Sequence, residues 1–262
     1  MAISISIITI NYNNINGLIK TFNSVKNQYF KHIEYIIVDG DSKDGSVDFL
    51  NENAKEFSHL IIEKDKGIYD AMNKGLDKCT GDFCLFLNSG DYFFSEKTLK
   101  NIVEKIDDKN KVYFSTAKIM SKQAEWLVPP ENKNINQWLK KHTPNHQTVL
   151  FPKSFYGKNR YDLFYSIVGD VDYIQRAKQE LKFIFINEIT VIFELGGVSN
   201  NTSNFKRIKK QIKESLVVHL KFYPNKLFYI FYVPLKFWAK YIVSKLTGSN
   251  YDKALKFINK YK

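Results

Sequence analysis

Short apolar blocks alternate with amphipathic stretches through the first third of the chain. Isoleucine recurs at positions 3, 5, 7, 8 and 10 of the first block, and the fourth block, residues 83–87, is apolar without interruption. Uninterrupted runs of this length are typical of strands buried on both faces. The pattern predicts strands at residues 3–10, 33–38, 59–63 and 83–87, with helices at residues 15–29 and 47–57 and from about residue 68. Strand and helix alternating at this spacing predict a parallel sheet with right-handed crossovers.

The rest of the chain is less regular. Pro129 and Pro130 break the pattern and open a polar stretch at residues 131–136, which we expect to be irregular and mobile until substrate binds. The periodicity predicts helices at residues 95–106, 170–181 and 204–219, and strands at residues 109–120, 123–128, 183–186 and 189–193.

Polar side chains follow the predicted strands where each strand ends. Asn11 follows the first strand, Asp39 the second, and Asn88-Ser89-Gly90-Asp91 the fourth. Open α/β sheets bind their ligands at the carboxyl ends of such strands. The alternative for residues 88–91 is an ordinary turn, because all four residue types are turn formers.

The stretch Asp65-Lys66-Gly67-Ile68-Tyr69-Asp70-Ala71-Met72-Asn73-Lys74-Gly75, paired with the strand-end acid at Asp91, resembles the nucleotide-sugar site of the family-2 glycosyltransferases. The resemblance covers residues 3–199 and implies an inverting enzyme of the GT-A fold, an α/β domain with a Rossmann-like mixed sheet. It implies a catalytic domain at residues 1–204, with a nucleotide-binding half at about 1–92 and an acceptor half at about 93–204. Residues 205–262 lie outside it and form a helical appendage.

The resemblance also implies a set of donor-binding residues. The loop that begins at Asp39 matches the family's nucleoside loop, except that Asp41 stands where glycine is commoner. The match implies that Asp39 accepts from a uracil N–H or a ribose hydroxyl. The other implied roles are Thr9 and Asn11 at the base, Asp65 and Lys66 beside the nucleotide, and Asp70 and Asn73 at the ribose or diphosphate. The alternative for Asp70 and Asn73 is a solvated helix face.

A divalent metal is implied at Asp91. The family's strand-end motif carries two acids, but Ser89 occupies the first position here, so Asp91 is the one firm ligand. Mn²⁺ or Mg²⁺ suits such a site, since a hard ion needs only one or two protein carboxylates when phosphates and water complete its shell. The ion would offset the charge of the leaving diphosphate.

Gly169-Asp170-Val171-Asp172, with Arg176 four residues on, is similar to the family signature whose first aspartate is the catalytic base. Inverting transfer needs one carboxylate to take the proton of the attacking hydroxyl, and Asp170 is the residue we expect to do so. Asp172 and Arg176 are better explained as a helix cap and an i,i+4 pair. His146 and Gln147 stand where the family contacts acceptor or diphosphate, although a lone histidine is usually structural.

Composition and charge add the setting. The 262 residues are 44% hydrophobic, which predicts a globular chain. Cys79 and Cys84 lack metal-ligand spacing and are expected to be free thiols in a reducing compartment, and the N-terminus lacks the features of a signal peptide. We therefore expect a cytoplasmic protein.

The net charge of +12 belongs to the tail. Residues 205–262 hold 14 Lys and Arg against Glu214 and Asp252, which leaves 25 basic and 25 acidic residues before them. No nucleic-acid recognition motif accompanies this charge. The apolar run at residues 227–235 is too short to span a bilayer, so we expect an amphipathic helix on an anionic membrane surface, with Trp238, Tyr241 and Phe257 as anchors. The alternative is a helical hairpin that packs on the catalytic domain or on a second subunit, forming a homo-oligomer.

Together these features predict a metal-dependent inverting glycosyltransferase. It would move a sugar from a nucleotide-diphosphate donor, UDP-linked by preference, to a lipid-linked intermediate of capsule, O-antigen or exopolysaccharide synthesis, as a peripheral protein on the inner face of the plasma membrane. One alternative is a nucleotidyltransferase on a related fold, which would want a Gly-rich basic loop where Asn11-Tyr12-Asn13-Asn14 stands. Another is a non-catalytic membrane-bound partner with a decayed site, suggested by Ser89.

Overall fold

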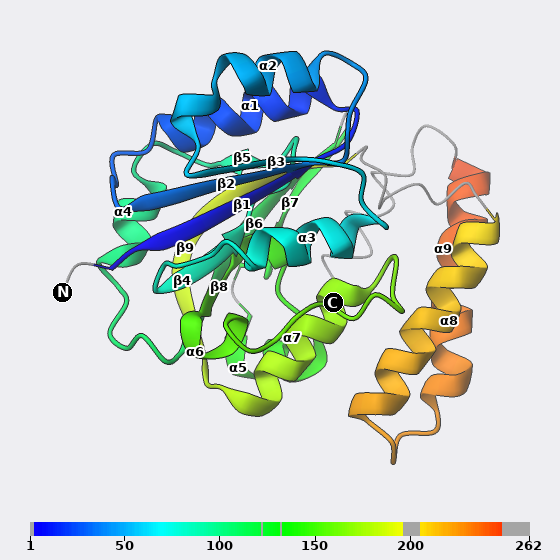
Figure 1. Cartoon of the computed structure of the whole chain (residues 1–262). Helices are drawn as coiled ribbons and strands as arrows, with labels where there is room; N and C mark the ends of the chain where they lie inside the picture. The colour runs from blue at the N-terminus through cyan, green and yellow to red at the C-terminus, as the bar shows by residue number, and fades with distance from the viewer. Residues whose placement is uncertain (1–2, 122, 132, 196–204, 248–262) are drawn as a thin grey trace.

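A mixed sheet forms the centre of the computed structural model, which describes residues 3–121, 123–131, 133–195 and 205–247. Its strands lie in the order β3-β2-β1-β4-β8-β6-β9-β5, and β7 pairs with β6 (Figure 1). Strands β3, β2, β1 and β4 are parallel, whereas β8 runs antiparallel to both of its neighbours. The strand bounds are β1 Ile5–Asn11, β2 Ile33–Asp39, β3 His59–Ile62, β4 Phe83–Phe86, β5 Tyr92–Phe93, β6 Val112–Met120, β7 Glu125–Val128, β8 Val149–Pro152 and β9 Phe183–Glu194.

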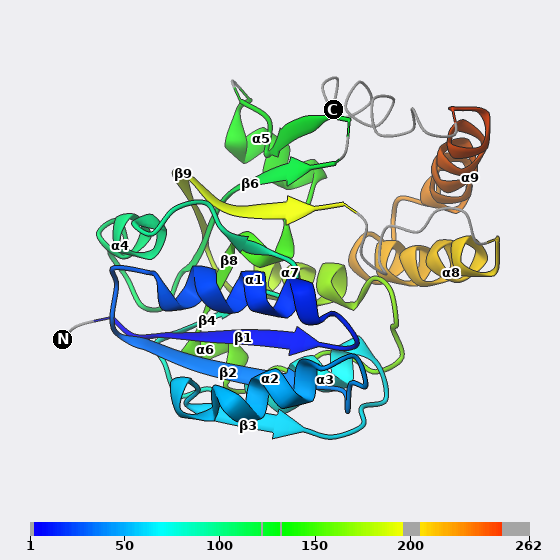
Figure 2. The same cartoon turned by 90° about the horizontal axis from the view of Figure 1, so that it is seen from above.

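Helices cover both faces of the sheet (Figures 1 and 2). One face packs against α1 (Ile15–Lys26), α2 (Ser46–Glu52) and α4 (Thr98–Val103), whose buried side chains share a core cluster with alternate residues of β1. The other face packs against α3 (Ile68–Leu76), α5 (Ile135–Lys141), α6 (Lys153–Tyr156) and α7 (Gly169–Glu180). Both faces of β1 and β4 are therefore buried, which explains their uninterrupted hydrophobicity.

The predicted strands of the first third are present, and their pairing confirms the expected parallel sheet. Several boundaries differ. Residues 183–194 form one strand rather than two, because β9 continues along β6 past a register shift. The second helix ends at Glu52 and is followed by the 3-10 turn Ala54–Glu56. The polar stretch at residues 131–136 is not irregular throughout, since the Asn134 side chain accepts from Gln137 N and begins α5.

The tail forms a hairpin of two helices, α8 (Phe205–Phe222) and α9 (Tyr229–Thr247). In Figures 1 and 2 the hairpin lies on the side of the molecule toward which the parallel strands run. Within the described part of the chain, no helix is both long enough and apolar enough to cross a membrane. Residues 196–199, where the resemblance ends, and the expected anchor Phe257 lie outside the described residues. Both cysteines are free thiols, as expected.

Candidate active site

The ends of β1 and β2 hold a buried polar cluster. Their register places Asn11 beside Asp39. The Asp39 carboxylate accepts from Asn11 Nδ2 at 2.7 Å, from the Ser42 amide at 2.7 Å and from the Ser42 hydroxyl at 2.9 Å. Asn11 Oδ1 is a buried acceptor with no hydrogen-bond partner among the described residues. Leaving a buried acceptor without a hydrogen bond is costly. Asn11 Oδ1 is therefore suited to accept from a donor outside the chain.

Thr9 lies deeper than the sequence suggested. Its side chain is completely buried, and the hydroxyl donates to Leu87 O at 2.7 Å and lies 3.3 Å from the Tyr35 hydroxyl. Burial raises the pKa of Tyr35, so this phenol stays neutral. The structure thus places Thr9 inside the sheet, two residues before Asn11. Its hydroxyl is hydrogen-bonded to the segment that follows β4.

The loop before α3 approaches the end of β2. A Cβ built at Gly40 would lie 2.7 Å from Asp65 Oδ2, so glycine at this position lets the Asp65 carboxylate come close. Asp65 Oδ1 accepts from the Gly67 amide, and Asp70 accepts from the Lys66 amide at 2.9 Å. Gly67 has a φ of 122°, which favours glycine there. Asp65 therefore lies beside the Asp39 cluster, and Lys66 is exposed.

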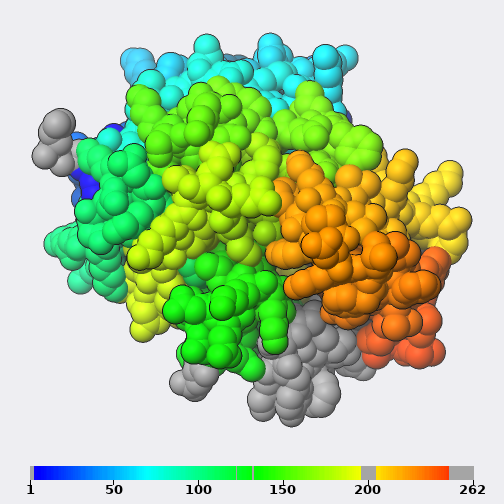
Figure 3. Space-filling view, turned by 90° about the horizontal axis from the view of Figure 1, so that it is seen from below, coloured from blue at the N-terminus to red at the C-terminus, as the bar shows by residue number. Residues whose placement is uncertain are grey.

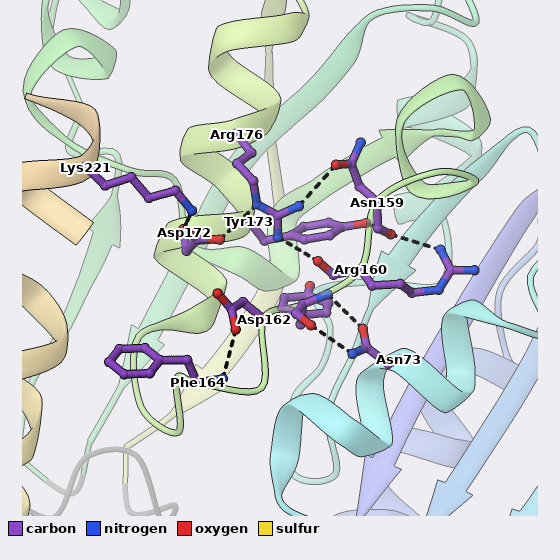
Figure 4. Close-up of polar contacts among 10 residues, drawn as sticks. Asn73, Asn159, Arg160, Asp162, Phe164, Asp172, Tyr173, Arg176 and Lys221 are labelled. Carbon is purple, nitrogen blue, oxygen red and sulfur yellow. Dashed lines mark hydrogen bonds and ion pairs between the residues drawn. The ribbon is translucent and has the colours of Figure 1, made fainter. Parts of the chain in front are cut away.

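Asn73 has an internal partner. Its Nδ2 donates to Tyr161 O at 2.9 Å, and its Oδ1 accepts from Tyr161 N at 2.8 Å (Figure 4). Both bonds run from α3 to the loop that precedes α7. The structure thus shows Asn73 fastening that loop rather than facing solvent or an open site.

The segment after β4 presents Asp91, the expected metal ligand. The residue is 6% exposed, and its Oδ2 accepts from Gln147 Nε2 at 2.8 Å. Burial raises the pKa of Asp91 to about 8, and the carboxylate of Glu194 adds to the rise. Ser89 is tied to its neighbours, since its amide donates to Ile10 O and its carbonyl accepts from Asn14 Nδ2. The structure thus brings Gln147 to the predicted metal position.

These residues suit a hard cation that takes most of its ligands from elsewhere. Asp91 supplies a buried carboxylate, and Asn88 Oδ1, three residues earlier, is a buried oxygen without a hydrogen-bond partner in the part of the chain that the structure describes. Oxygen donors are what Mn²⁺ and Mg²⁺ prefer. Among the described residues no three His, Cys, Asp or Glu side chains gather into a metal cage, so phosphate and water oxygens would have to complete the shell.

His146 belongs to the core. It is buried, stacks on Phe86 with ring centroids 4.8 Å apart, and has Nε2 2.5 Å from the Tyr161 hydroxyl. Burial lowers the pKa of His146 to about 3, so the ring is neutral at physiological pH. Of the two explanations that the sequence allowed, the structure shows the satisfied structural histidine.

Asp170, the expected base, stands in the first turn of α7 and is half-buried. Tyr69 of α3 donates its hydroxyl to Asp170 Oδ1 at 3.2 Å, and a Cβ at Gly169 would lie 2.8 Å from the Tyr69 ring. Burial raises the pKa of Asp170, and the Tyr69 hydrogen bond opposes the rise. Tyr69 in turn stacks on Tyr161, with ring centroids 5.4 Å apart. One aromatic layer thus joins Asp170 to the loop that Asn73 fastens.

Comparison with known families identifies the family of the chain. A family described as Glycosyl transferase family 2 matches residues 6–162, more than half of the chain. The chain belongs to glycosyl transferase family 2. An uncharacterized glycosyltransferase of Mycobacterium tuberculosis is 31% identical to this family-2 chain over 207 residues, covering 76% of the chain and 78% of the relative. The putative teichuronic acid biosynthesis glycosyltransferase TuaG of Bacillus subtilis is 25% identical over 213 residues, covering 79% and 84%.

Solved structures confirm the fold of the family-2 chain. The mannosyltransferase PcManGT of Pyrobaculum calidifontis, in complex with GDP-Man and Mn²⁺, matches with a TM-score of 0.63 at 12% identity, over 98% of this chain and 79% of that one. TarS 1-349 of S. aureus, in complex with UDP-GlcNAc, matches with a TM-score of 0.59 at 16% identity, over 86% and 75%. The chain spans 39% of the longer TarS chain, with a TM-score of 0.61 at 16% identity over 81% of this chain. The predicted GT-A class with C-terminal helices is confirmed.

Asp172 ties the tail to the family-2 domain. Its buried carboxylate accepts from Arg176 Nε at 2.8 Å and from Lys221 Nζ of α8 at 2.7 Å (Figure 4). The predicted i,i+4 pair between Asp172 and Arg176 is therefore present. Lys221 is a partner that the sequence did not predict, because it lies in the tail.

Glu214 is a second contact of this kind that sequence reasoning missed. It lies on α8, is 2% exposed, and accepts from the backbone amides of Ser166, Ile167 and Val168 at 2.9–3.2 Å. Helix α7 has no side-chain cap of its own at Val168. The tail of this family-2 chain therefore supplies the acid that satisfies the backbone entering the Asp170 helix. The sequence feature that could have pointed to Glu214 is that it is one of only two acidic residues in a basic tail.

Proposed function

We propose that the chain is an inverting glycosyltransferase that uses a nucleotide-diphosphate sugar, UDP-linked by preference, with Asp170 as the catalytic base. The observation that carries the proposal is the environment of Asp170. A half-buried carboxylate with a raised pKa, aimed by a tyrosine and placed at the start of a helix, has the chemistry of a general base poised for a hydroxyl. The family assignment names the group that is transferred.

In this mechanism Asp170 accepts the proton of the acceptor hydroxyl as that oxygen attacks the anomeric carbon from the face opposite the nucleotide. Tyr69 is a positioning residue, because its hydroxyl donates to Asp170 Oδ1 and so orients the carboxylate. No covalent enzyme intermediate is needed, since a single in-line displacement inverts the anomeric centre.

The donor would lie along the strand ends. Asn11 Oδ1 is a buried acceptor suited to an N–H of the base or a ribose hydroxyl, and Asp39 shapes the loop around it. Asp65, Lys66 and Asp70 border the same edge. A Mn²⁺ or Mg²⁺ ion held by Asp91, when bound, would act as a Lewis acid on the diphosphate. Three further residues hold the donor site in place through hydrogen bonds to neighbouring segments or to Asp91, namely Thr9, Ser89 and Gln147.

A surface glycan is the proposed product class. Two groups of relatives support it, named for PGL/p-HBAD biosynthesis in mycobacteria and for teichuronic acid biosynthesis in Bacillus subtilis. We propose a lipid-linked acceptor, reached by a peripheral protein on the cytoplasmic face of the plasma membrane.

The outer face of α9 supports this membrane contact. Four large apolar side chains of α9 are more than half exposed: Phe231 at 80%, Leu235 at 70%, Ile242 at 53% and Leu246 at 81%. They follow one another at intervals of four, seven and four residues, so they share one helix face. An exposed apolar stripe along one helix face is suited to the interface of a bilayer. Self-association through the same stripe is the alternative, and sedimentation at several concentrations distinguishes it.

Turnover tests the catalytic proposal. Asp170→Asn should keep the nucleotide-induced rise in melting temperature measured with UDP and Mn²⁺, yet lose sugar transfer from a panel of nucleotide sugars by at least about a hundredfold. Transfer at the wild-type rate by a folded Asp170→Asn protein would refute the base assignment. A wild-type chain that binds UDP but transfers no sugar would support the non-catalytic partner instead. Pyrophosphate release from a nucleoside triphosphate would support the nucleotidyltransferase.

The membrane proposal needs point variants, because deleting the tail would also remove Glu214, which binds the backbone entering α7. Phe231→Ser/Leu235→Ser should shift the protein from sedimenting with anionic vesicles to the supernatant, while the UDP-induced thermal shift stays unchanged. Val217→Ser, at an exposed apolar residue of α8, is the control. Unchanged partitioning of the double variant would refute membrane contact through α9.

A further inference from the structure

A cavity lies apart from the strand-end cluster, between the tail hairpin and helices α5 and α7. Its volume is about 360 Å³. None of the predicted donor or metal residues lines it. Figure 3 shows the hairpin, in orange, seated beside the yellow-green surface of the segment that includes α7.

The cavity reaches the neighbourhood of the proposed base. Val168 and Val171 form part of its wall, and they flank Asp170 in the chain. The cavity therefore adjoins the first turn of α7, which carries Asp170.

The lining combines apolar walls with cationic groups. Lys140 and Lys141 come from the end of α5, and Lys236 and Lys240 come from α9. Among the described residues that line the cavity there is no aspartate or glutamate. Positive groups around a concave, low-dielectric space attract anions more strongly than the same groups on a flat surface. The apolar side chains beside them, including Val218, Val233 and Phe237, offer nothing to a fully hydrated ion.

Helix α9 connects this cavity with the outer apolar stripe. Five of its residues line the cavity and follow the i, i+4, i+7, i+8, i+11 pattern of one helix face, namely Tyr229, Val233, Lys236, Phe237 and Lys240. The exposed stripe at Phe231 and Leu235 lies on the opposite side. One helix thus presents an apolar face outward and an apolar, cationic face inward, toward α5 and α7.

We propose that this cavity binds the phosphorylated lipid end of the acceptor, a phosphate or diphosphate ester attached to an apolar chain. The proposal rests on the proposed function, because it names the acceptor class of that same site. Lysines hold the phosphate, the apolar wall holds the first carbons of the chain, and the sugar hydroxyl reaches Asp170. At about 30 Å³ per water, the cavity volume equals roughly a dozen waters, so the rest of a long chain stays in the bilayer.

Binding of octyl phosphate to the full-length chain tests the proposal, measured by calorimetry in the absence of membranes. Lys140→Gln/Lys141→Gln should weaken binding at least tenfold. Lys55→Gln/Lys97→Gln, which removes the same charge from exposed lysines elsewhere, should leave it unchanged. Inorganic phosphate and octyl glucoside, which carry only one half of the chemistry each, should bind at least tenfold more weakly.

Equal affinity in the two double variants would overturn the proposal, as would equal binding of octyl phosphate and inorganic phosphate. Displacement of octyl phosphate by phosphatidylglycerol vesicles would also overturn it, because the cavity would then take bilayer headgroups. Asp170→Asn separates the two proposals, since it should keep octyl phosphate binding while losing transfer. Normal transfer without octyl phosphate binding rejects the cavity alone, and binding without any transfer rejects the proposed function alone.

Discussion

Glu214 is the residue by which the tail should control the stability of the Asp170 helix. Its carboxylate accepts from three consecutive backbone amides and from the Ser166 hydroxyl at 2.9 Å. Ser166 is exposed, so water can replace its partner, but Val168 is buried and Ile167 half-buried. Glu214→Gln keeps the shape, removes the charge and turns an amide NH₂ group toward backbone N–H donors.

The expected cost follows from these contacts. Hydrogen bonds to a charged group contribute about 1.5–3 kcal/mol each, against about 0.5–1.5 kcal/mol for neutral pairs. A negative charge at a helix N-terminus adds about 0.3–2 kcal/mol. With two amides sheltered from water, we expect Glu214→Gln to lower the free energy of unfolding by about 2–4 kcal/mol. For a chain of this size that corresponds to a melting temperature lower by roughly 6–12 °C.

Differential scanning calorimetry of Glu214→Gln against Lys213→Gln checks this prediction. Lys213 is the exposed neighbour on α8. Its substitution should change the free energy of unfolding by less than about 0.5 kcal/mol, as is usual for surface positions. Below the melting temperature, Glu214→Gln should lower kcat while leaving stabilisation by UDP and Mn²⁺ unchanged, because the loop positions the base and not the donor. Equal melting temperatures for the two variants would show that the carboxylate does not hold this turn.

Three further predictions follow from the site and the core. Tyr69→Phe removes a hydrogen bond that stabilises the charged form of Asp170, so the pKa of Asp170 should rise further. The acid limb of the kcat/KM profile should then move to higher pH. An acid limb that stays in place would contradict the role given to Tyr69. Asp91→Asn should abolish the rise in melting temperature that Mn²⁺ produces with UDP. Asp77→Asn, at an exposed residue, is the control. A rise that persists in Asp91→Asn would show that Asp91 is not a metal ligand. Gly75→Ala would place a Cβ 2.5 Å from Ile8 Cγ2. This overpacking should lower the free energy of unfolding by about 1–3 kcal/mol by calorimetry, whereas Lys78→Ala should not, and equal stability of the two variants would contradict the close contact.

The local pattern of residues was enough for the parallel half of the sheet. Buried strands need apolar residues on both faces, and the residues that end such strands must be polar to meet solvent or ligand. Asp39 and Asp91 were therefore visible as strand-end acids. The sequence predicts two strands within residues 183–194 because Asn187 and Glu188 interrupt the apolar run, and only pairing with β6 shows that the strand continues.

By itself, the sequence determined the order of strands and helices in the parallel half of the sheet, the strand-end acids and, through its motifs, the family. Tertiary structure alone decided the partners of those residues. Tyr69 reaches Asp170 across 101 positions, Gln147 reaches Asp91 across 56, and Glu214 reaches Ser166 across 48. Periodicity reports only neighbours along the chain, whereas packing of α3, α7 and α8 determines which distant polar groups are buried together and must satisfy one another.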